Sequence, residues 1–127
     1  SHQIIDELHA HRSDKLFRSL EYAGAARKGK SLQIIISTVG HDKSHFFYDI
    51  WKRAKENTTD TSLYGCIYSP EDGSDFEDPR TWYAANPSLG TAFTEEQFAR
   101  ELKTAKSAGS ATWNNFIRYR LNSWQNT

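Results

Sequence analysis

The stretch LQIIISTVG, residues 32–40, decides the fold of this chain. Its β-branched run ends in small hydroxyl residues and a glycine, and such a run is typical of a strand buried on both faces. A shorter apolar run, QIID at residues 3–6, lies about 30 residues earlier. A connection of that length accommodates a helical crossover, so we expect two parallel neighbouring strands.

Apolar residues at helical spacing fill the segments around these strands. The spacing predicts one helix over about 13–24 and another over about 46–54, the second capped by Ser44 or Asp42. The stretch LYGCIYS at 63–69 predicts a third strand. The order strand, helix, strand, helix, strand favours an α/β fold with a parallel sheet of about three strands.

The remainder of the chain is expected to be helical. Asp-Pro at residues 78–79 marks a helix start, and Thr94 with Gln97 has the pattern of a capping box. A last helix is expected after Gly109. Its predicted apolar stripe comprises Trp113, Ile117, Leu121 and Trp124.

Composition excludes several classes of protein. The 127 residues suit a single domain, and 16 basic residues balance 16 acidic ones, so net charge indicates no partner. There is no signal-peptide pattern and no apolar run near the roughly 20 residues that span a bilayer. The single cysteine, Cys66, suits a reducing compartment and is expected to be packed. The chain begins Ser1-His2-Gln3 and contains no Met, which is typical of an excerpt from a longer protein.

Acidic and hydroxyl residues follow the first two predicted strands. Asp6 and Glu7 have the Walker B pattern, in which the first carboxylate binds Mg²⁺ and the second orients or deprotonates water. Ser37 and Thr38 would lie at the same edge of the sheet, where hydroxyls can sense a γ-phosphate. Each pair also fits an ordinary strand-end loop.

Five segments together resemble a known family. They resemble, in order, successive parts of the large terminase subunit of tailed bacteriophages and prophages, the motor that pumps DNA into procapsids. The segments are QIIDELHAH, AARKGKSLQIIISTVG, HFFYDIWKRAKE, DPRTWYAANPSLG and FIRYRLNSWQ. The ANPSLG and LNSW stretches are the most specific, because no general rule of folding demands them.

The resemblance implies ATP-driven DNA translocation during viral genome packaging. By resemblance, Asp6 is the magnesium ligand, Glu7 the catalytic carboxylate, and Ser37, Thr38 and Gly40 the coupling motif. The implied cofactors are Mg²⁺ and ATP. The implied partners are the small terminase subunit, the portal and double-stranded DNA, with no membrane, in the cytoplasm of the bacterial host.

The resemblance also implies a division of the chain. Residues 1–70 would form the Walker B and coupling half of a P-loop NTPase-like core, and residues 71–127 a helical, lid-like region. In the family the phosphate loop, or Walker A motif, lies upstream of the Walker B strand, and the nuclease domain would lie downstream. The one match to G-x-x-x-x-G-K-[ST], GAARKGKS at residues 24–31, follows Walker B and leads into a predicted strand rather than a helix, so it lacks the context of a phosphate loop. We therefore expect the isolated chain neither to bind ATP tightly nor to hydrolyse it, and to self-associate through an exposed sheet edge.

The histidines suggest a metal site instead. His9, His11, His41 and His45 could gather at one edge of the sheet, and imidazole with carboxylate suits zinc. A metal-dependent hydrolase is therefore an alternative. In the terminase comparison, however, the first two histidines belong to the Walker B segment.

Two further alternatives remain. Arg27, in the basic turn RKGK, is a candidate to contact DNA or to act in trans as an arginine finger, although a solvated turn has the same composition. The whole chain could also be a non-catalytic α/β interaction module or a prophage remnant. That protein would share the predicted fold but need no nucleotide.

Overall fold

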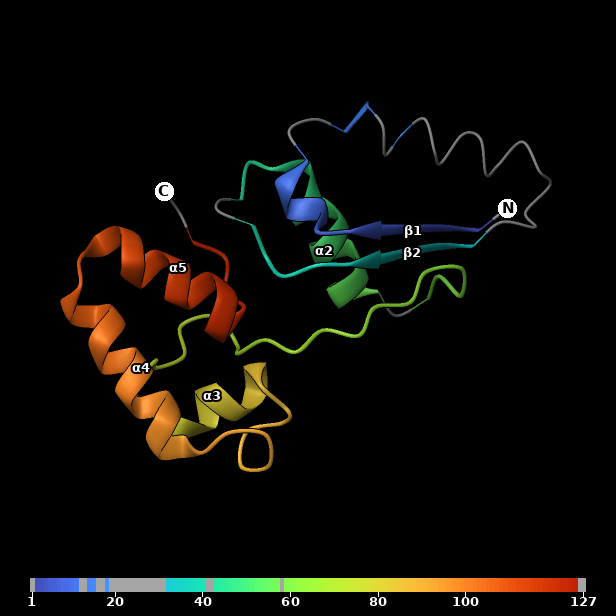
Figure 1. The fold of residues 1–127 in the computed structure, drawn as a ribbon. Coiled ribbons are helices and arrows are strands. Elements are labelled where there is room, and N and C mark those ends of the chain that lie inside the picture. Colours follow the sequence, from blue (N-terminus) through green and yellow to red (C-terminus); the bar gives the residue numbers. More distant parts are fainter. Residues whose placement is uncertain are drawn as a thin grey trace.

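The structure is a computed structural model that describes residues 2–11, 14, 15, 18, 32–40, 43–57 and 59–125. These residues form two strands, a short 3-10 helix and four α-helices (Figure 1). Of the helix expected over 13–24 only residues 14, 15 and 18 are described, and the basic turn with Arg27 lies outside the described residues. Within those ranges no helix is both long and apolar enough to cross a membrane.

The two strands pair as predicted. Strand β1 (Gln3–Asp6) runs parallel to β2 (Gln33–Ile36), in a register that sets Gln3 opposite Gln33 and Asp6 opposite Ile36. The expectation of a parallel α/β pair is thus confirmed, in a sheet of two strands among the described residues. One face of the sheet is buried through Ile5, whereas the other face leaves Ile4 70% exposed.

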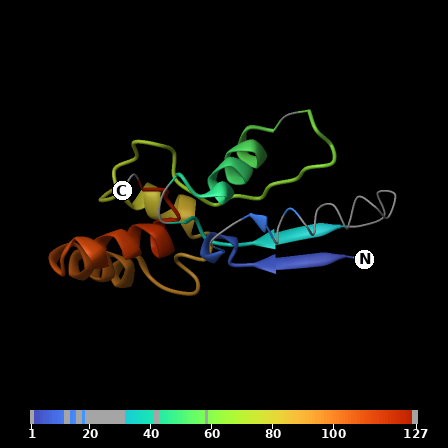
Figure 2. The ribbon, with the colours of Figure 1, turned by 90° about the horizontal axis from the view of Figure 1, so that it is seen from above.

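Helix α2 (Phe46–Glu56) covers the buried face of the sheet (Figure 2). Its N-cap is His45 rather than Ser44 or Asp42, because the His45 ring Nδ1 accepts the Phe47 N–H at 3.1 Å. Burial of the apolar face of this helix creates the first of two cores. This sheet core comprises Ile5, Leu8, Val39, Phe47, Ile50 and Trp124.

Residues 63–69, predicted as a third strand, form no strand here. Their side chains still alternate, with Leu63 and Ile67 half-buried and Tyr64 88% exposed. A strand needs a neighbour to take its backbone hydrogen bonds. A hollow of about 580 Å³, lined by parts of β2, α2 and residues 60–67, lies where a ladder with β2 would form.

The course of this segment also corrects the expectation for Cys66. The segment passes so close to α2 that a Cβ on Gly65 would lie 2.9 Å from the Ala54 Cβ. Glycine permits that approach, and the next side chain then points outward. Cys66 is therefore exposed rather than packed.

The helical lobe consists of α3 (Pro79–Ala85), α4 (Glu95–Ser107) and α5 (Ser110–Leu121). Its helices begin where local signals predicted. Asp78 caps α3 by accepting the Arg80 backbone N–H at 3.0 Å. The hydrogen bond from the Arg80 side chain, and after it the one from the Arg80 backbone, lowers the pKa of the Asp78 carboxyl. Thr94 and Gln97 form the predicted capping box of α4.

The lobe has a core of its own. Phe98 is fully buried, with its ring centroid 4.9 Å from that of Trp82. The lobe core comprises Trp82, Leu89, Phe98, Leu102, Ala105, Phe116, Ile117 and Leu121. Trp124 lies beyond the end of α5, not on its apolar stripe, and packs in the sheet core instead. The division at residues 70 and 71 remains a prediction.

The capping box gives a stability prediction. Thr94→Ala removes the acceptor of the Gln97 N–H, so we expect the free energy of unfolding to fall by about 1 kcal/mol. Urea denaturation followed by circular dichroism measures this. The matched control is Thr104→Ala on the exposed side of the same helix, which should be neutral or slightly stabilising because Ala is the better helix former. Equal losses in both variants would contradict the capping role.

Candidate functional site

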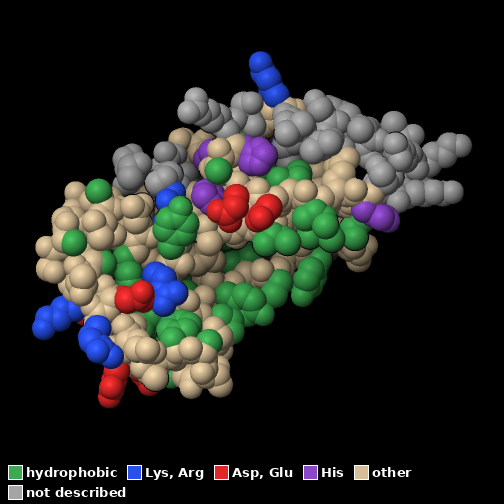
Figure 3. Space-filling model, viewed as in Figure 1, with side chains coloured by type: hydrophobic (Ala, Val, Ile, Leu, Met, Phe, Trp, Pro, Cys, Tyr) green, Lys and Arg blue, Asp and Glu red, His purple; other side chains and the backbone are tan. Residues whose placement is uncertain are grey.

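The carboxyl ends of the two strands bring the predicted site residues together. Asp6 is the exposed last residue of β1, opposite Ile36. The next residue, Glu7, extends the ladder, since its N–H donates to the Ile36 carbonyl at 2.8 Å. Ser37 follows directly on β2. The acidic pair and the hydroxyl pair therefore share one edge of the sheet, as the sequence predicted, and acidic and histidine side chains gather there (Figure 3).

Glu7 has an uncommon backbone conformation. Its φ of 54° and ψ of 50° lie in the left-handed region, which residues other than glycine rarely occupy. The short helix η1 (Leu8–Ala10) follows at once and turns His9 back toward Glu7. The His9 Nε2 lies 2.8 Å from the Glu7 Oε2, with the His9 side chain 7% and the Glu7 side chain 51% exposed. A buried imidazole thus holds a half-exposed carboxylate in place.

The hydroxyl pair connects to the same turn. The backbone N–H of His9 donates to the Ser37 Oγ at 3.4 Å, and the Ser37 hydroxyl donates to the Thr38 carbonyl at 2.7 Å. The Thr38 Oγ1 is buried and has no hydrogen-bond partner among the described residues. A buried hydroxyl without a partner costs free energy, so this atom is a candidate for interaction with a group from outside the chain.

Two residues near the C-terminus, Asn122 and Trp124, complete the site. The sequence indicated no site role for Asn122, and it placed Trp124 on the apolar stripe of the last helix. The Asn122 Oδ1 accepts the Val39 N–H at 3.0 Å. A Cβ on Gly40 would lie 3.0 Å from the Trp124 Cζ3 and 3.4 Å from the His9 Cβ. The LNSW stretch was recognised only as a family signature. Its contacts were not predictable, because they join positions more than 80 residues apart.

The histidines do not form a metal site among the described residues, where no group of three or more His, Cys, Asp or Glu side chains could hold an ion. His45 uses both ring nitrogens: Nδ1 caps α2, and Nε2 donates to the His11 carbonyl. That tautomer leaves no lone pair for zinc. His41 lies outside the described residues.

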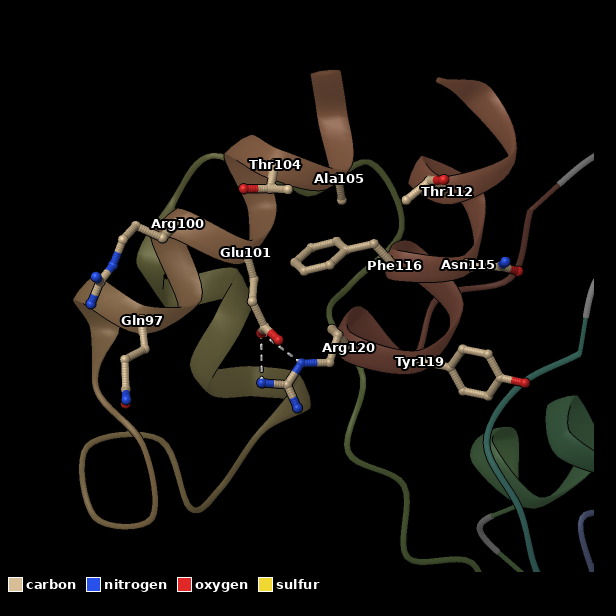
Figure 4. A pocket seen from close by; sticks show the side chains of 10 residues that line it. All are labelled: Gln97, Arg100, Glu101, Thr104, Ala105, Thr112, Asn115, Phe116, Tyr119 and Arg120. Atoms are coloured by element: carbon tan, nitrogen blue, oxygen red, sulfur yellow. Dashed lines mark hydrogen bonds and ion pairs between the residues drawn. The ribbon is translucent and has the colours of Figure 1, made fainter. Parts of the chain in front are cut away.

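A separate hollow of about 700 Å³ lies between α4 and α5 (Figure 4). Phe116 projects between the two helices, and Arg120 faces Glu101 with 2.8 Å between the Arg120 Nη2 and the Glu101 Oε2. The guanidinium also lies 4.8 Å from the Phe93 ring centroid. The Arg120 charge in this hollow is thus already paired, and none of the described residues that line the hollow belongs to the strand ends.

No family model matches the chain. A comparison with solved structures identifies a class: the fold matches that of part of a phage large terminase. The solved structure is the large terminase of bacteriophage HK97, with a TM-score of 0.79 and 25% identity over 97% of this chain. The predicted terminase resemblance is confirmed, and the chain is terminase-like over nearly its whole length.

A curated relative supports the comparison by sequence. Protein YmfN of Escherichia coli K12 is 28% identical over 125 residues, which is 95% of this chain. The chain spans only about a quarter of both relatives, 27% of YmfN and 26% of the HK97 terminase.

The contact between Gly40 and Trp124 yields a second prediction. In Gly40→Ala the new methyl group would press on the indole, so we expect a loss of about 1–2 kcal/mol in stability and a changed tryptophan emission. The same substitution should cost much less in a Trp124→Phe background, where the smaller ring leaves room. Equal costs in the two backgrounds, measured by urea denaturation, would place the strain elsewhere.

Proposed function

We propose that this chain supplies the acidic and coupling elements of an ATPase of the large-terminase type, which powers DNA translocation into procapsids. The observation that carries the proposal is the shared strand edge, where Asp6 and Glu7 meet Ser37 and Thr38. The likeness to the HK97 large terminase supports it. The small terminase subunit, the portal and double-stranded DNA are the proposed partners, in the bacterial cytoplasm.

The two carboxylates fit magnesium-dependent phosphoryl chemistry. Asp6 is exposed at the end of a parallel strand, and a carboxylate oxygen in that position suits Mg²⁺, which would neutralise charge on the nucleotide phosphates. Glu7 would orient or deprotonate the attacking water. Its contact with His9 restricts the rotamers of the carboxylate, which keeps it aimed across the strand ends.

The hydroxyl pair would report the state of the nucleotide. Thr38 offers a buried hydroxyl without a partner among the described residues, one residue from the Ser37 side chain that accepts the His9 N–H. A movement of the Glu7 carboxylate would move His9, whose side chain contacts Glu7 and whose backbone N–H donates to Ser37. In this proposal the segment Ser37–Gly40 is the coupling motif.

The phosphate loop of such an ATPase precedes Walker B and opens a helix, whereas GAARKGKS at residues 24–31 follows Walker B and precedes β2. In this proposal the phosphate loop therefore comes from a further polypeptide segment. The open face of the sheet offers a surface for it. Ile4, Ile34 and Ile36 are 70%, 39% and 58% exposed there, beside the acidic cluster (Figure 3). Apolar side chains on one sheet face are stabilised by a covering layer.

The same open face is the observation that favours the second candidate, a non-catalytic interaction module. An exposed row of isoleucines is typical of a protein-binding surface. That module would need the open face but not the two carboxylates. Substitution of the carboxylates therefore separates the two functions.

ATP hydrolysis tests the proposal. We expect no turnover by the 127-residue chain alone, and magnesium-dependent turnover once a large-terminase phosphate-loop segment is joined ahead of residue 1. In that longer polypeptide Glu7→Gln should lower kcat at least 100-fold, because it removes the base but keeps the shape of the side chain. Nucleotide binding, followed by calorimetry, should persist.

The control is Glu71→Gln in the exposed acidic loop, which should leave kcat unchanged. Hydrolysis that survives Glu7→Gln would contradict the assignment. If the 127-residue chain alone hydrolysed ATP as fast as the longer polypeptide, the proposal that the phosphate loop comes from a further segment would be contradicted.

Self-association through the edge of β1 that no described strand pairs with is a further expectation. The N–H groups of Gln3 and Glu7 point to β2, so by alternation the N–H of Ile4 points to the unpaired edge. Ile4→Pro should therefore reduce the mass increase seen at high concentration by light scattering. Ile4→Ala removes the same apolar side chain but keeps the N–H, and should still associate. A monomeric mass for the unchanged chain at high concentration would refute edge pairing.

A further inference from the structure

Asn122 makes three contacts that join three separate parts of the molecule. Its own backbone N–H closes the last turn of α5 by donating to the Ile117 carbonyl. Its Oδ1 accepts the Val39 N–H at 3.0 Å, and its Nδ2 donates to the Tyr68 carbonyl at 2.8 Å. One side chain therefore connects the helical lobe, the segment after β2 and the extended segment that leads into the lobe.

The conformation of Asn122 explains why asparagine suits this position. Its φ of 47° and ψ of 44° are left-handed, a region that Asn tolerates better than most residues. The amide offers an acceptor for Val39 and a donor for Tyr68 on two separate atoms, Oδ1 and Nδ2. An aspartate at position 122 would keep the acceptor for the Val39 N–H but lose the donor to Tyr68. A glycine would keep only the left-handed backbone conformation.

The neighbouring Trp124 reinforces the connection. It is 8% exposed and packs edge-on against Phe47 and Tyr48, with ring centroids 5.6 and 5.2 Å away. Its ring also lies against Gly40. The chain after α5 thus contacts the Ser37–Gly40 segment at two consecutive residues, Val39 and Gly40.

These contacts continue to the acidic pair. Glu7 contacts His9 through the side chains, and the His9 N–H donates to Ser37. Two residues after Ser37, Val39 is 1% exposed and its N–H donates to Asn122. A shift of the strand-end segment would therefore be resisted, or transmitted, by α5.

We propose that Asn122 is a positioning residue that ties the Ser37–Gly40 segment to α5, so that the helical lobe follows changes at the strand ends. The hydrogen bonds of Asn122 to Val39 and Ile117 are sufficient evidence for the structural connection. Its role in coupling nucleotide state to the lobe rests on the proposed ATPase function.

Native-state hydrogen exchange of the 127-residue chain tests the tie. In Asn122→Gly the Val39 amide loses its acceptor, and we expect its exchange to accelerate about three- to tenfold. The last turn of α5 should stay protected, since glycine adopts the left-handed conformation without strain. In Asn122→Asp the Val39 amide should remain protected, because the carboxylate still accepts its hydrogen bond.

The matched control is Asn86→Gly. Asn86 also joins elements through its side-chain amide, which donates to the Trp82 and Arg120 carbonyls, but both lie inside the helical lobe. This variant should leave exchange at Val39 within about twofold of the unchanged chain. Unchanged exchange in Asn122→Gly, or equal acceleration in Asn86→Gly, would overturn the tie. If the glycine variant does not fold, Asn122→Ala takes its place, because it also removes the acceptor, and Val39 must then exchange faster than in Asn122→Asp.

The coupling role is tested in the longer polypeptide that carries a phosphate loop. We expect ATP to change amide protection in α5 of the unchanged protein, and Asn122→Gly to abolish that change while KM for ATP stays within about twofold. A purely structural role would leave the nucleotide response intact, and that result would overturn coupling. Failure of the unchanged longer polypeptide to hydrolyse ATP would count against the proposed function instead. The exchange test on the 127-residue chain uses no nucleotide, so its result would still stand.

Discussion

The parallel ladder between β1 and β2 is the constraint on which the rest of the site depends. Because the strands run in the same direction, both carboxyl ends meet at one edge, and the residues that leave the ladder are neighbours. An antiparallel pair would separate Asp6 from Ser37 by the length of the sheet. The left-handed turn at Glu7 then folds His9 over the strand ends, which is possible because the chain leaves β1 at once.

Two cores meet through very few side chains. The lobe core is built around Phe98, and the sheet core around Leu8 and Val39, all almost fully buried. Trp124 belongs to the sheet core although it follows the last helix of the lobe. Such an arrangement lets each core remain rigid while the few residues between them determine their relative position. Asn122 occupies that junction.

Local features of this fold could be predicted from the sequence, and distant ones could not. The caps at Asp78 and Thr94 are decided within about four residues, so their patterns were sufficient. The β2 run was recognised by its β-branched residues, and the position of the acidic pair followed from parallel pairing. Residues 63–69 carry the same alternation, but a strand also needs a partner, which alternation does not reveal.

The same limit applied to the site. Cys66 was misjudged because its apolar neighbours suggested burial, whereas burial depends on which side of the segment faces α2. Asn122 was visible only as part of a family signature, and Trp124 was wrongly placed on the apolar stripe of the last helix. Their roles depend on a left-handed residue after α5 that redirects the chain toward Val39 and Gly40, and nothing within a few residues predicts that destination.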